Sequence, residues 1–566
     1  MQYDALSYIN VRIPMRDGVE LAADLYLPAG SVFLPLPTIL SLSPYLATST
    51  RDGGSLAWVR RGFAGLRVDC RGRGQSGGTF VPWTTDLDDA WDLLEWISHQ
   101  AWSNGRVGMV GGSYPAATQL AALCSGHPAL VAAAPSAITT DPYSLYYTGG
   151  AQELSFMMSW HLGICGTPPA PPAGAARPDF AFVRQQLPLA NLADIAGLPC
   201  PSWEAIAAND WRNAFWRQKA DPRDLRRSRA GIFFQGSWFD LLGETVFESF
   251  SRFMDGVDPH DTTSNRRFTC LRVGPWGHGV NTPEGDYTFG DHSLVTEASE
   301  IDFLSALLNG NTPATADQPA PIQIFVMGRN VWRYEQQWPL ARTRYTPLYL
   351  GSGGKANTAA GDGRLTWEAP AGEEPADHFT YDPVNPVPTC GGRIVGSGGQ
   401  RDQREIEARR DVLVYTTAPL AADLEVTGPV RMRLFAASSA PDTDFTVKLV
   451  DLQPDGRPLN VCDGILRARF RNGLDQPGRL LTPGETVTLD IHVDVTAYCF
   501  LKGHAIRVEI SSSNFPHYAR NPNTGTPIAT ETRLQQANQT VFHSVRHPSH
   551  LLLPVIPADS VPLPTV

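Results

Sequence analysis

The sequence predicts an α/β fold that is interrupted by a helical insertion and followed by a β-sandwich or jelly roll. Strands and helices alternate through the first part of the chain, which is typical of a mainly parallel sheet covered on both faces. A helical, proline-rich stretch interrupts this alternation, and beyond about residue 345 short strands follow one another without helices. With 566 residues the chain exceeds what one hydrophobic core usually serves, so two or three domains are expected.

The first part of the chain carries the α/β pattern. Its strands are expected at 9–28, as a hairpin around the turn at 16–18, and at 37–42, 62–68, 106–110 and 230–234. The clearest helix is expected over 85–100, where apolar side chains fall on one face and Thr85 and Asp88 can form a capping pair. Another helix is expected over 243–254, directly after the last of these strands.

The insertion is expected between residues 143 and 227. It begins with helical sequence rich in aromatic and sulfur side chains, passes through the proline-rich segment T-P-P-A-P-P-A-G-A-A-R-P, and continues with short helical patterns. In the last part of the chain, apolar and polar residues alternate with period two, as at 430–434, 445–449 and 487–493. This pattern predicts many short strands, which we expect to pack on the rest of the molecule and to close part of a cleft.

The composition excludes several classes of protein. With 42% hydrophobic and 18% charged residues the chain is globular, and its net charge of −11 argues against nucleic acid or an anionic membrane surface as a partner. We find no signal peptide and no apolar run long enough to span a membrane, so a cytoplasmic protein is expected.

The eight cysteines are scattered and form no C-x-x-C pair. This favours free thiols in a reducing compartment over a disulfide frame or a zinc site, although one or two disulfides are left open. The cysteines are Cys70, Cys124, Cys165, Cys200, Cys270, Cys390, Cys462 and Cys499.

The stretch V-G-M-V-G-G-S-Y-P-A-A-T-Q-L, at 107–120, places one serine between a buried strand and a helix. A nucleophilic serine needs exposure, a neighbouring base and donors for an oxyanion, and a sharp strand-to-helix turn supplies the exposure. Gly111 fits the first glycine of the G-x-S-x-G pattern, whereas Pro115 stands in place of the second. The alternative is a tight turn in which Ser113 only caps the helix. The strand–turn–helix context favours a nucleophile.

Asp240 and His278 are the candidate acid and base. Asp240 follows a buried strand within G-S-W-F-D-L-L-G-E, and its alternative role is to cap the next helix. His278 lies in the loop G-P-W-G-H-G, where a solvated surface histidine is the alternative. The order serine, aspartate, histidine is the one that a nucleophile on such a turn requires. Rival acids lie in polar, loop-like contexts: Asp210, Asp221, Asp224, Asp255 and Asp258.

The oxyanion needs two donors. One is the backbone N–H of Tyr114, which directly follows the serine. The second is expected from the loop L-S-L-S-P-Y-L-A-T at 40–48, where Tyr45 is the only strong side-chain donor aligned for this role besides Ser41 and Ser43.

Together these motifs resemble the bacterial cocaine esterase (CocE/NonD-type) family, which is related to X-Pro dipeptidyl-peptidases and α-amino-acid ester hydrolases. The resemblance rests on P-Y at 44–45, D-C-R-G-R-G-Q-S-G-G at 69–78, G-G-S-Y at 111–114, W-F-D-L-L-G-E at 238–244 and G-P-W-G-H-G at 274–279. It implies an α/β-hydrolase domain at 1–142 and 228–345, a helical cap at 143–227 and a jelly roll at 346–566.

The resemblance also implies an activity and a set of site residues. It implies a serine hydrolase that cleaves a carboxylic ester through an acyl-enzyme on Ser113, with no metal ion or organic cofactor. His278 is then the base, Asp240 orients it, and Tyr45 with the Tyr114 amide forms the oxyanion hole.

Two more residues are candidates to line an acyl pocket. They are Trp160 and Leu242, for which ordinary core packing is the alternative.

Three alternatives stay open. The same triad could cleave amides or dipeptides, which requires an acidic pocket for the substrate's amine, with Glu153 and Asp141 as candidates. Transfer of the acyl group to an alcohol would make the chain an acyltransferase. A non-catalytic binder is the alternative of another class, because fold alone does not give function. The expected partner is a small-molecule ester or amide rather than nucleic acid or a membrane, and a homodimer is left open.

Overall fold

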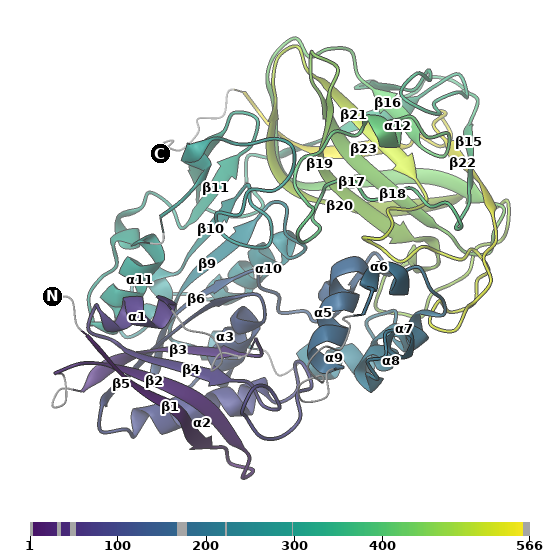
Figure 1. The fold of residues 1–566 in the computed structure, drawn as a ribbon. Coiled ribbons are helices and arrows are strands. Elements are labelled where there is room, and N and C mark those ends of the chain that lie inside the picture. The colour runs from purple at the N-terminus through teal and green to yellow at the C-terminus, as the bar shows by residue number, and fades with distance from the viewer. Residues whose placement is uncertain are drawn as a thin grey trace.

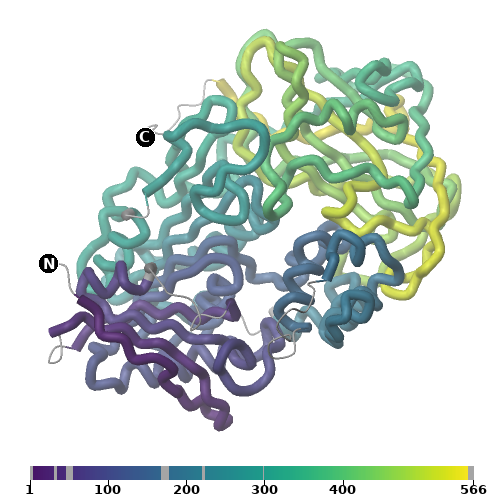
Figure 2. The backbone as a smooth tube through the Cα atoms, in the orientation of Figure 1, coloured from purple at the N-terminus to yellow at the C-terminus, as the bar shows by residue number. Residues whose placement is uncertain are grey.

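The computed structural model describes residues 4–30, 35–45, 53–166, 178–220, 224–296 and 298–558. A mixed α/β domain, a small group of helices and a β-rich domain lie against one another (Figure 1). The backbone tube shows the helical group, in blue, next to the green and yellow strands of the C-terminal domain (Figure 2). The proline-rich segment at 167–177, the end of the loop at 40–48 and Asp221 lie outside the described residues.

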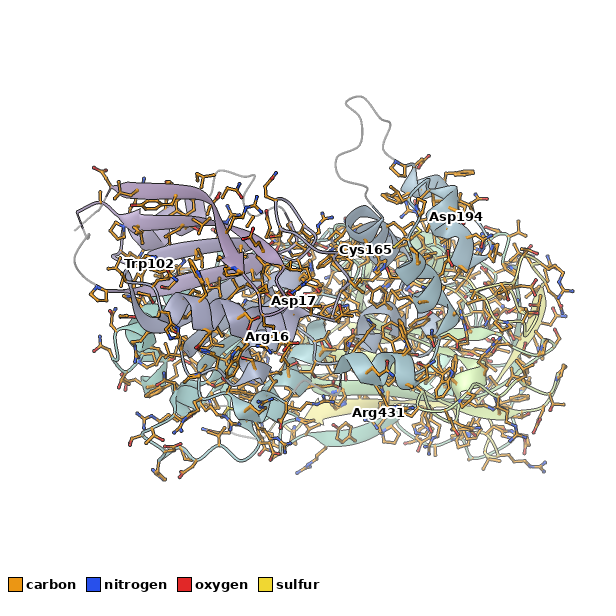
Figure 3. The ribbon with its side chains drawn as sticks, turned by 90° about the horizontal axis from the view of Figure 1, so that it is seen from below. Arg16, Asp17, Trp102, Cys165, Asp194 and Arg431 are labelled. Carbon is orange, nitrogen blue, oxygen red and sulfur yellow. The ribbon has the colours of Figure 1, made fainter. Side chains whose placement is uncertain are left out.

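The α/β domain is built on one ten-stranded sheet. Its strands lie in the order β1 (Ala5–Pro14), β2 (Glu20–Pro28), β4 (Ala64–Asp69), β3 (Leu36–Ser43), β5 (Ser103–Gly112), β6 (Leu130–Ser136), β9 (Gly231–Ser237), β10 (Cys270–Gly274), β11 (Ile322–Val326) and β12 (Val331–Glu335). The strands from β4 to β11 pair in parallel, and β1, β2 and β12 pair antiparallel at the two edges. The predicted N-terminal hairpin is thus present as β1 and β2, and Figure 3 labels Arg16 and Asp17 at its turn.

Helices cover both faces of this sheet because the central strands are apolar on both sides. Helices α1 (Gly53–Val59) and α11 (Ala298–Leu308) pack on one face, where Phe233 contacts Phe303. The other face carries α2 (Asp86–Ser98), α3 (Tyr114–Ser125) and α10 (Gly243–Met254).

The predicted capping pair of α2 is wrong. Thr85 occupies the N-cap position but makes no side-chain cap hydrogen bond. The carboxylate of Asp88 instead accepts a hydrogen bond from Arg16 at 3.0 Å. Because that arginine comes from the distant hairpin turn, local sequence could not reveal the competing ion pair.

The cap joins β6 to β9. It contains α4 (Tyr143–Tyr146), β7 (Tyr147–Thr148), β8 (Ala151–Gln152), α5 (Ser155–Cys165), α6 (Phe180–Val183), α7 (Leu192–Ile195), α8 (Pro201–Ala208) and α9 (Ala214–Ala220). Its helices share an apolar cluster with Phe515, Ala519 and Ile528 of the C-terminal domain. The backbone N–H of Leu154 also donates to the carbonyl of His517 at 2.7 Å, so the C-terminal domain supports the cap directly.

The described part of the C-terminal domain, which ends at residue 558, is a β domain of eleven strands with the short helix α12 (Arg404–Glu407) in one connection. Ten strands follow the order β15 (Asp377–Tyr381), β22 (Ala537–Phe542), β17 (Leu424–Ser438), β23 (His550–Ile556), β13 (Arg344–Gly351), β14 (Arg364–Thr366), β16 (Leu413–Thr416), β21 (Ala505–Ser511), β18 (Asp444–Leu452) and β19 (Pro458–Arg467), while β20 (Val487–Phe500) pairs with β17. The α/β-hydrolase fold with a cap and a C-terminal β domain is therefore confirmed.

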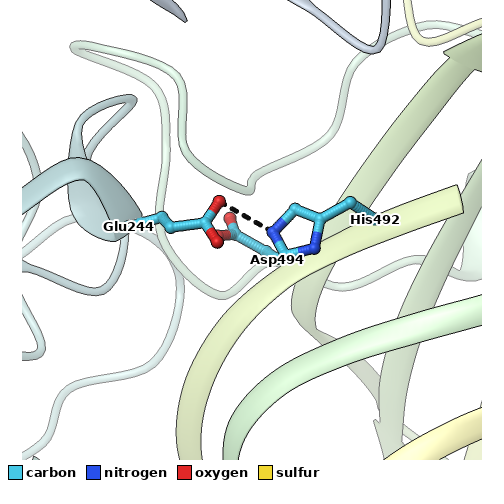
Figure 4. Close-up of side chains that lie close together, drawn as sticks. All are labelled: Glu244, His492 and Asp494. Atoms are coloured by element: carbon cyan, nitrogen blue, oxygen red, sulfur yellow. Dashed lines mark hydrogen bonds and ion pairs between the residues drawn. The ribbon is translucent and has the colours of Figure 1, made fainter. Parts of the chain in front are cut away.

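Ion pairs join the C-terminal domain to the hydrolase domain. Arg333 on β12 and Glu425 on β17 form a buried pair at 2.7 Å. In Figure 4 the carboxylate of Glu244, at the start of α10, meets the imidazole of His492 on β20 at 2.7 Å. Among the described residues, no helix is both long and apolar enough to cross a membrane.

Candidate active site

Ser113 lies on the tight turn between β5 and α3. Its backbone has φ 63° and ψ −130°, a conformation that residues other than glycine rarely adopt. Neighbouring side chains must be small: a Cβ on Gly111 would lie 2.5 Å from Pro115, and one on Gly112 would lie 2.5 Å from the hydroxyl of Ser136. Pro115 is tolerated in place of the expected glycine because the first helical turn lacks intrahelical acceptors for its N–H groups.

The structure brings Ser113, His278 and Asp240 together. The Nε2 atom of His278 lies 3.0 Å from the Ser113 hydroxyl, and its Nδ1 atom lies 2.9 Å from a carboxylate oxygen of Asp240. The carboxylate also accepts the backbone N–H of Leu242 at 3.2 Å, which fixes its orientation. Asp240 does not cap α10, whose N-cap residue is Leu242.

The electrostatics suit a general base. Burial opposes a charge on His278, but the carboxylates of Asp240 and Glu284 outweigh burial, so the pKa of His278 is raised. The Asp240 side chain is 2% exposed and the His278 side chain 18% exposed, so the pair is shielded while the imidazole still reaches the site. An imidazolium formed during catalysis would therefore be stabilised where it forms.

Two candidate oxyanion donors, the Tyr45 hydroxyl and the Tyr114 backbone N–H, belong to the surroundings of the serine. The Tyr45 hydroxyl lies 3.2 Å from the Ser113 oxygen, and the indole N–H of Trp160 donates to the Tyr45 oxygen at 3.0 Å. Tyr114 is the first residue of α3, so its backbone N–H belongs to the donors that a helix leaves unpaired. Its side chain has a separate, structural role, since the hydroxyl donates to buried Asp86 at 2.9 Å.

Arg73 is a supporting residue that sequence reasoning missed. It lies in the D-C-R-G-R-G-Q-S-G-G block and donates to the carbonyl of Pro44 at 3.0 Å and to that of Ile164 at 2.7 Å. It thereby joins the segment that carries Tyr45 to the C-terminal end of α5.

A largely apolar pocket opens beside the serine. Its walls come from the hydrolase domain and the cap: Trp83, Ser113, Tyr114, Ala117, Ala137, Ile138, Thr139, Leu145, Phe156, Met157, Trp160, Leu241, Leu242 and His278. Both Trp160 and Leu242 are thus at the position expected of acyl-pocket residues. Sequence reasoning missed Phe156 and Met157, although the aromatic and sulfur-rich composition of this helix was the available signal.

Neither the C-terminal domain nor the two candidate cap acids line this pocket in the part of the chain that the structure describes. The described lining residues come from the hydrolase domain and the cap, and the C-terminal domain contacts the cap through the shared apolar cluster. The cap acids proposed to hold an amine are also not among the lining residues: Glu153 pairs with His517 at 2.8 Å and Asp141 pairs with Arg212 at 2.9 Å.

Comparison with known proteins identifies the family. Residues 17–280 match the family model described as X-Pro dipeptidyl-peptidase (S15 family), and residues 314–552 match the one described as X-Pro dipeptidyl-peptidase C-terminal non-catalytic domain. Cocaine esterase from Rhodococcus sp. (strain MB1 Bresler) is 39% identical over 580 residues, which cover 97% of this chain and 98% of that protein. The chain belongs to the cocaine esterase family.

Solved structures agree with the cocaine esterase family assignment. An aminopeptidase from a marine sediment archaeon, Thaumarchaeota archaeon, has a TM-score of 0.82 at 26% identity over 98% of this chain and 97% of its own. An α-amino acid ester hydrolase has a TM-score of 0.81 at 27% identity over the same shares. As a member of the cocaine esterase family the chain is a serine hydrolase, so the alternative of a non-catalytic binder falls away.

One group of possible metal ligands occurs among the described residues of this cocaine esterase relative. Ligand atoms of Glu244, His492 and Asp494 lie within 4.8 Å of one another. These ligand atoms have partners in the protein: the guanidinium of Arg393 lies 3.3 Å from the Asp494 carboxylate, and the Glu244 carboxylate is hydrogen-bonded to the His492 imidazole. We therefore interpret the group as the interdomain ion-pair cluster of Figure 4.

Proposed function

We propose that this chain hydrolyses small carboxylic esters whose acyl group is uncharged and apolar, with aromatic acyl groups preferred. The observation that carries the proposal is the pocket beside Ser113, whose lining includes the aromatic rings of Trp83, Phe156 and Trp160 and, among the residues that the structure describes, no acidic side chain. An apolar pocket favours an acyl group that loses little hydration on binding.

Acylation follows from the hydrogen bonds around the serine. The Ser113 oxygen attacks the ester carbonyl while its proton moves to Nε2 of His278, and Asp240 stabilises the resulting imidazolium. The carbonyl oxygen becomes an oxyanion that accepts from the Tyr45 hydroxyl and the Tyr114 amide. Each such donor contributes roughly 3–4 kcal/mol of transition-state stabilisation.

Collapse of this intermediate breaks the bond to the alcohol, which leaves with the proton that His278 held. Water then takes the place of the alcohol, loses a proton to His278 and attacks the acyl-enzyme. The acid departs and Ser113 regains its proton. Acyl transfer would differ only in that an alcohol replaces this water.

Amide or dipeptide cleavage is the second candidate. It is supported by the X-Pro dipeptidyl-peptidase family models and by the structural similarity to an aminopeptidase. A substrate with a free amine needs an acidic partner near the serine, and the described part of the pocket lining contains none. Without such an acidic partner, the pocket favours esters with neutral acyl groups over substrates with a free amine.

The test is a matched substrate panel. We expect higher kcat/KM for p-nitrophenyl benzoate than for either glycyl-proline p-nitroanilide or the p-nitrophenyl ester of phenylglycine. Preference for the dipeptide anilide or for the amino ester would overturn the proposed acyl specificity. Ser113→Ala should abolish all turnover and labelling by a fluorophosphonate, whereas Ser98→Ala, at the half-buried last position of α2, is the control that keeps both.

We further propose a cytoplasmic location. The eight cysteines, all of them free thiols, support a reducing compartment. Fractionation of the native host, followed by immunodetection, would test it. The expectations of no nucleic-acid partner, no membrane partner and a homodimer stay predictions.

A further inference from the structure

Two of the eight cysteines lie next to each other in the cap. Cys165 is the last residue of α5, where Figure 3 labels it, and Cys200 directly precedes α8. The two thiols hydrogen-bond each other and contact the same apolar cluster. The backbones are also close, because a Cβ built on Gly166 would lie 2.9 Å from the Cβ of Leu198.

A chain of hydrogen bonds ends on one of these sulfur atoms. The Tyr146 hydroxyl lies 2.8 Å from Nδ1 of His161, whose Nε2 lies 2.8 Å from the hydroxyl of Ser202. That hydroxyl lies 3.3 Å from the sulfur of Cys200. With Tyr146 donating to Nδ1, His161 donates to Ser202, and Ser202 can donate to the sulfur.

This arrangement gives the two thiols different pKa values. The hydrogen bond from Cys165 lowers the pKa of Cys200 against the opposing effect of burial, and His161 lowers it further. The same hydrogen bond, together with burial, raises the pKa of Cys165. Cys200 is therefore the more acidic of the two thiols, and Cys165 is the one that holds its proton more tightly. A thiolate beside a second thiol is the arrangement in which oxidation yields a disulfide.

We propose that Cys165 and Cys200 form a peroxide-sensitive thiol pair that closes to a disulfide within the cap. Because Cys200 is only 2% exposed, the oxidant must be small and uncharged, and hydrogen peroxide meets both requirements. Cys165 is half-buried at the end of its helix.

The reaction balances with one peroxide. The Cys200 thiolate attacks one peroxide oxygen, the O–O bond breaks, and the sulfur becomes a sulfenic acid while hydroxide leaves and takes up the proton of Cys165 as water. The Cys165 thiolate then attacks the sulfenic sulfur, the S–O bond breaks, and the released hydroxide takes up a proton from solvent as a second water. Two thiols are oxidised and the peroxide is reduced.

The pair is positioned to affect the acyl pocket. Helix α5 carries Phe156 and Trp160 in the pocket wall, and the disulfide would tie its C-terminal end to α8. Oxidation would thus fix the helix that orients the oxyanion tyrosine.

The test uses the full-length enzyme, reduced, freed of reductant and treated with a small excess of hydrogen peroxide before denaturation, alkylation and peptide mapping. We expect a cross-linked peptide pair containing Cys165 and Cys200, a fall from eight free thiols to six, and recovery of all eight with dithiothreitol. Cys390→Ser, which removes another half-buried cysteine, should leave the cross-link intact, and Cys165→Ser or Cys200→Ser should abolish it.

Two results would overturn the proposal. One is a wild-type protein in which both cysteines remain alkylated after peroxide treatment. The other is Cys200 that accumulates as sulfinic acid with no cross-link to Cys165. Because the wild-type protein alone decides between these outcomes, a variant that fails to fold leaves the test valid. The readout is independent of esterase activity and therefore separate from the proposed function.

Discussion

Trp160 of the cap donates its indole hydrogen to the hydroxyl oxygen of Tyr45 across 3.0 Å. The same Tyr45 oxygen lies 3.2 Å from the side-chain oxygen of Ser113. Because Trp160 occupies a lone pair, the hydroxyl hydrogen of Tyr45 is left to point toward the serine and the oxyanion. A cap residue therefore orients the hydrolase-domain hydroxyl that we propose as an oxyanion donor.

Trp160→Phe should lower kcat roughly 2- to 10-fold, the size of one net hydrogen bond, because the ring stays and only the N–H is lost. Tyr45→Phe should lower kcat about 10²- to 10³-fold. If Trp160 acts through the tyrosine, adding Trp160→Phe to Tyr45→Phe should cause no further loss in steady-state kcat. An equal loss in both backgrounds would contradict this role.

Glu284 should set part of the pH dependence. The neutral imidazole of His278 is the active base, and its raised pKa means that kcat/KM falls as pH drops through a value above 6.5. Glu284→Gln removes a negative charge that raises this pKa, so the acid limb of the pH–rate profile should move to lower pH with an unchanged plateau. Glu204→Gln, an exposed cap position, should leave the limb in place. An unmoved limb in Glu284→Gln would count against this contribution.

Gly112→Ala should destabilise the nucleophile turn by about 1–3 kcal/mol, because the new methyl group would lie 2.5 Å from the Ser136 hydroxyl. The second substitution Ser136→Ala removes that hydroxyl and should restore most of the stability. Thermal unfolding of the single and double variants measures both effects. Failure of the second substitution to recover stability would place the strain elsewhere.

The ion pair between Glu244 and His492 should stabilise the enzyme in a defined pH window. Burial opposes both charges, but each partner favours the charge on the other, so the pKa of Glu244 is lowered and that of His492 is raised. The contribution of Glu244 to the free energy of unfolding is present above pH 4.5 and is lost as the pH falls. The contribution of His492 is present below pH 6.5 and is lost as the pH rises. The neighbouring Asp494 and Arg393 stay in place in the variants below.

His492→Gln should therefore lower the unfolding temperature most between pH 4.5 and 6.5 and least at alkaline pH. His99→Gln, whose histidine is 71% exposed, is the matched control with little effect. Unfolding followed by circular dichroism across this range measures the difference. A temperature difference that is constant with pH would show that the substitution acts through packing rather than charge.

Much of the fold was predictable because it rests on local patterns. The apolar strands, the helix over 243–254 and the strand–turn–helix around Ser113 each leave a signal within about fifteen residues. The order of serine, acid and base along the chain then follows from the order of parallel strands, whose carboxyl ends meet at one edge of the sheet.

The contacts made by the cap were not predictable in this way. Trp160 meets Tyr45 because the rotation of α5 is set by Leu154, Met158 and Leu162, which pack against the C-terminal domain. Their spacing of four residues marks one apolar face of the helix, but the sequence of the helix does not say which part of the molecule that face meets. The same holds for Phe156, which is one of many apolar residues in this helix, and only the packed structure separates its pocket-lining role from ordinary core.

The shared apolar cluster beneath the cap has a consequence for how substrate preference can change. Ser113, Asp240 and His278 all lie before residue 345, whereas the helix that carries Phe156 and Trp160 packs on a cluster that the C-terminal domain helps to form. New substrate preferences can therefore arise from substitutions at residues such as Phe515 or Ile528, remote from any chemistry, that tilt the cap without touching the nucleophile.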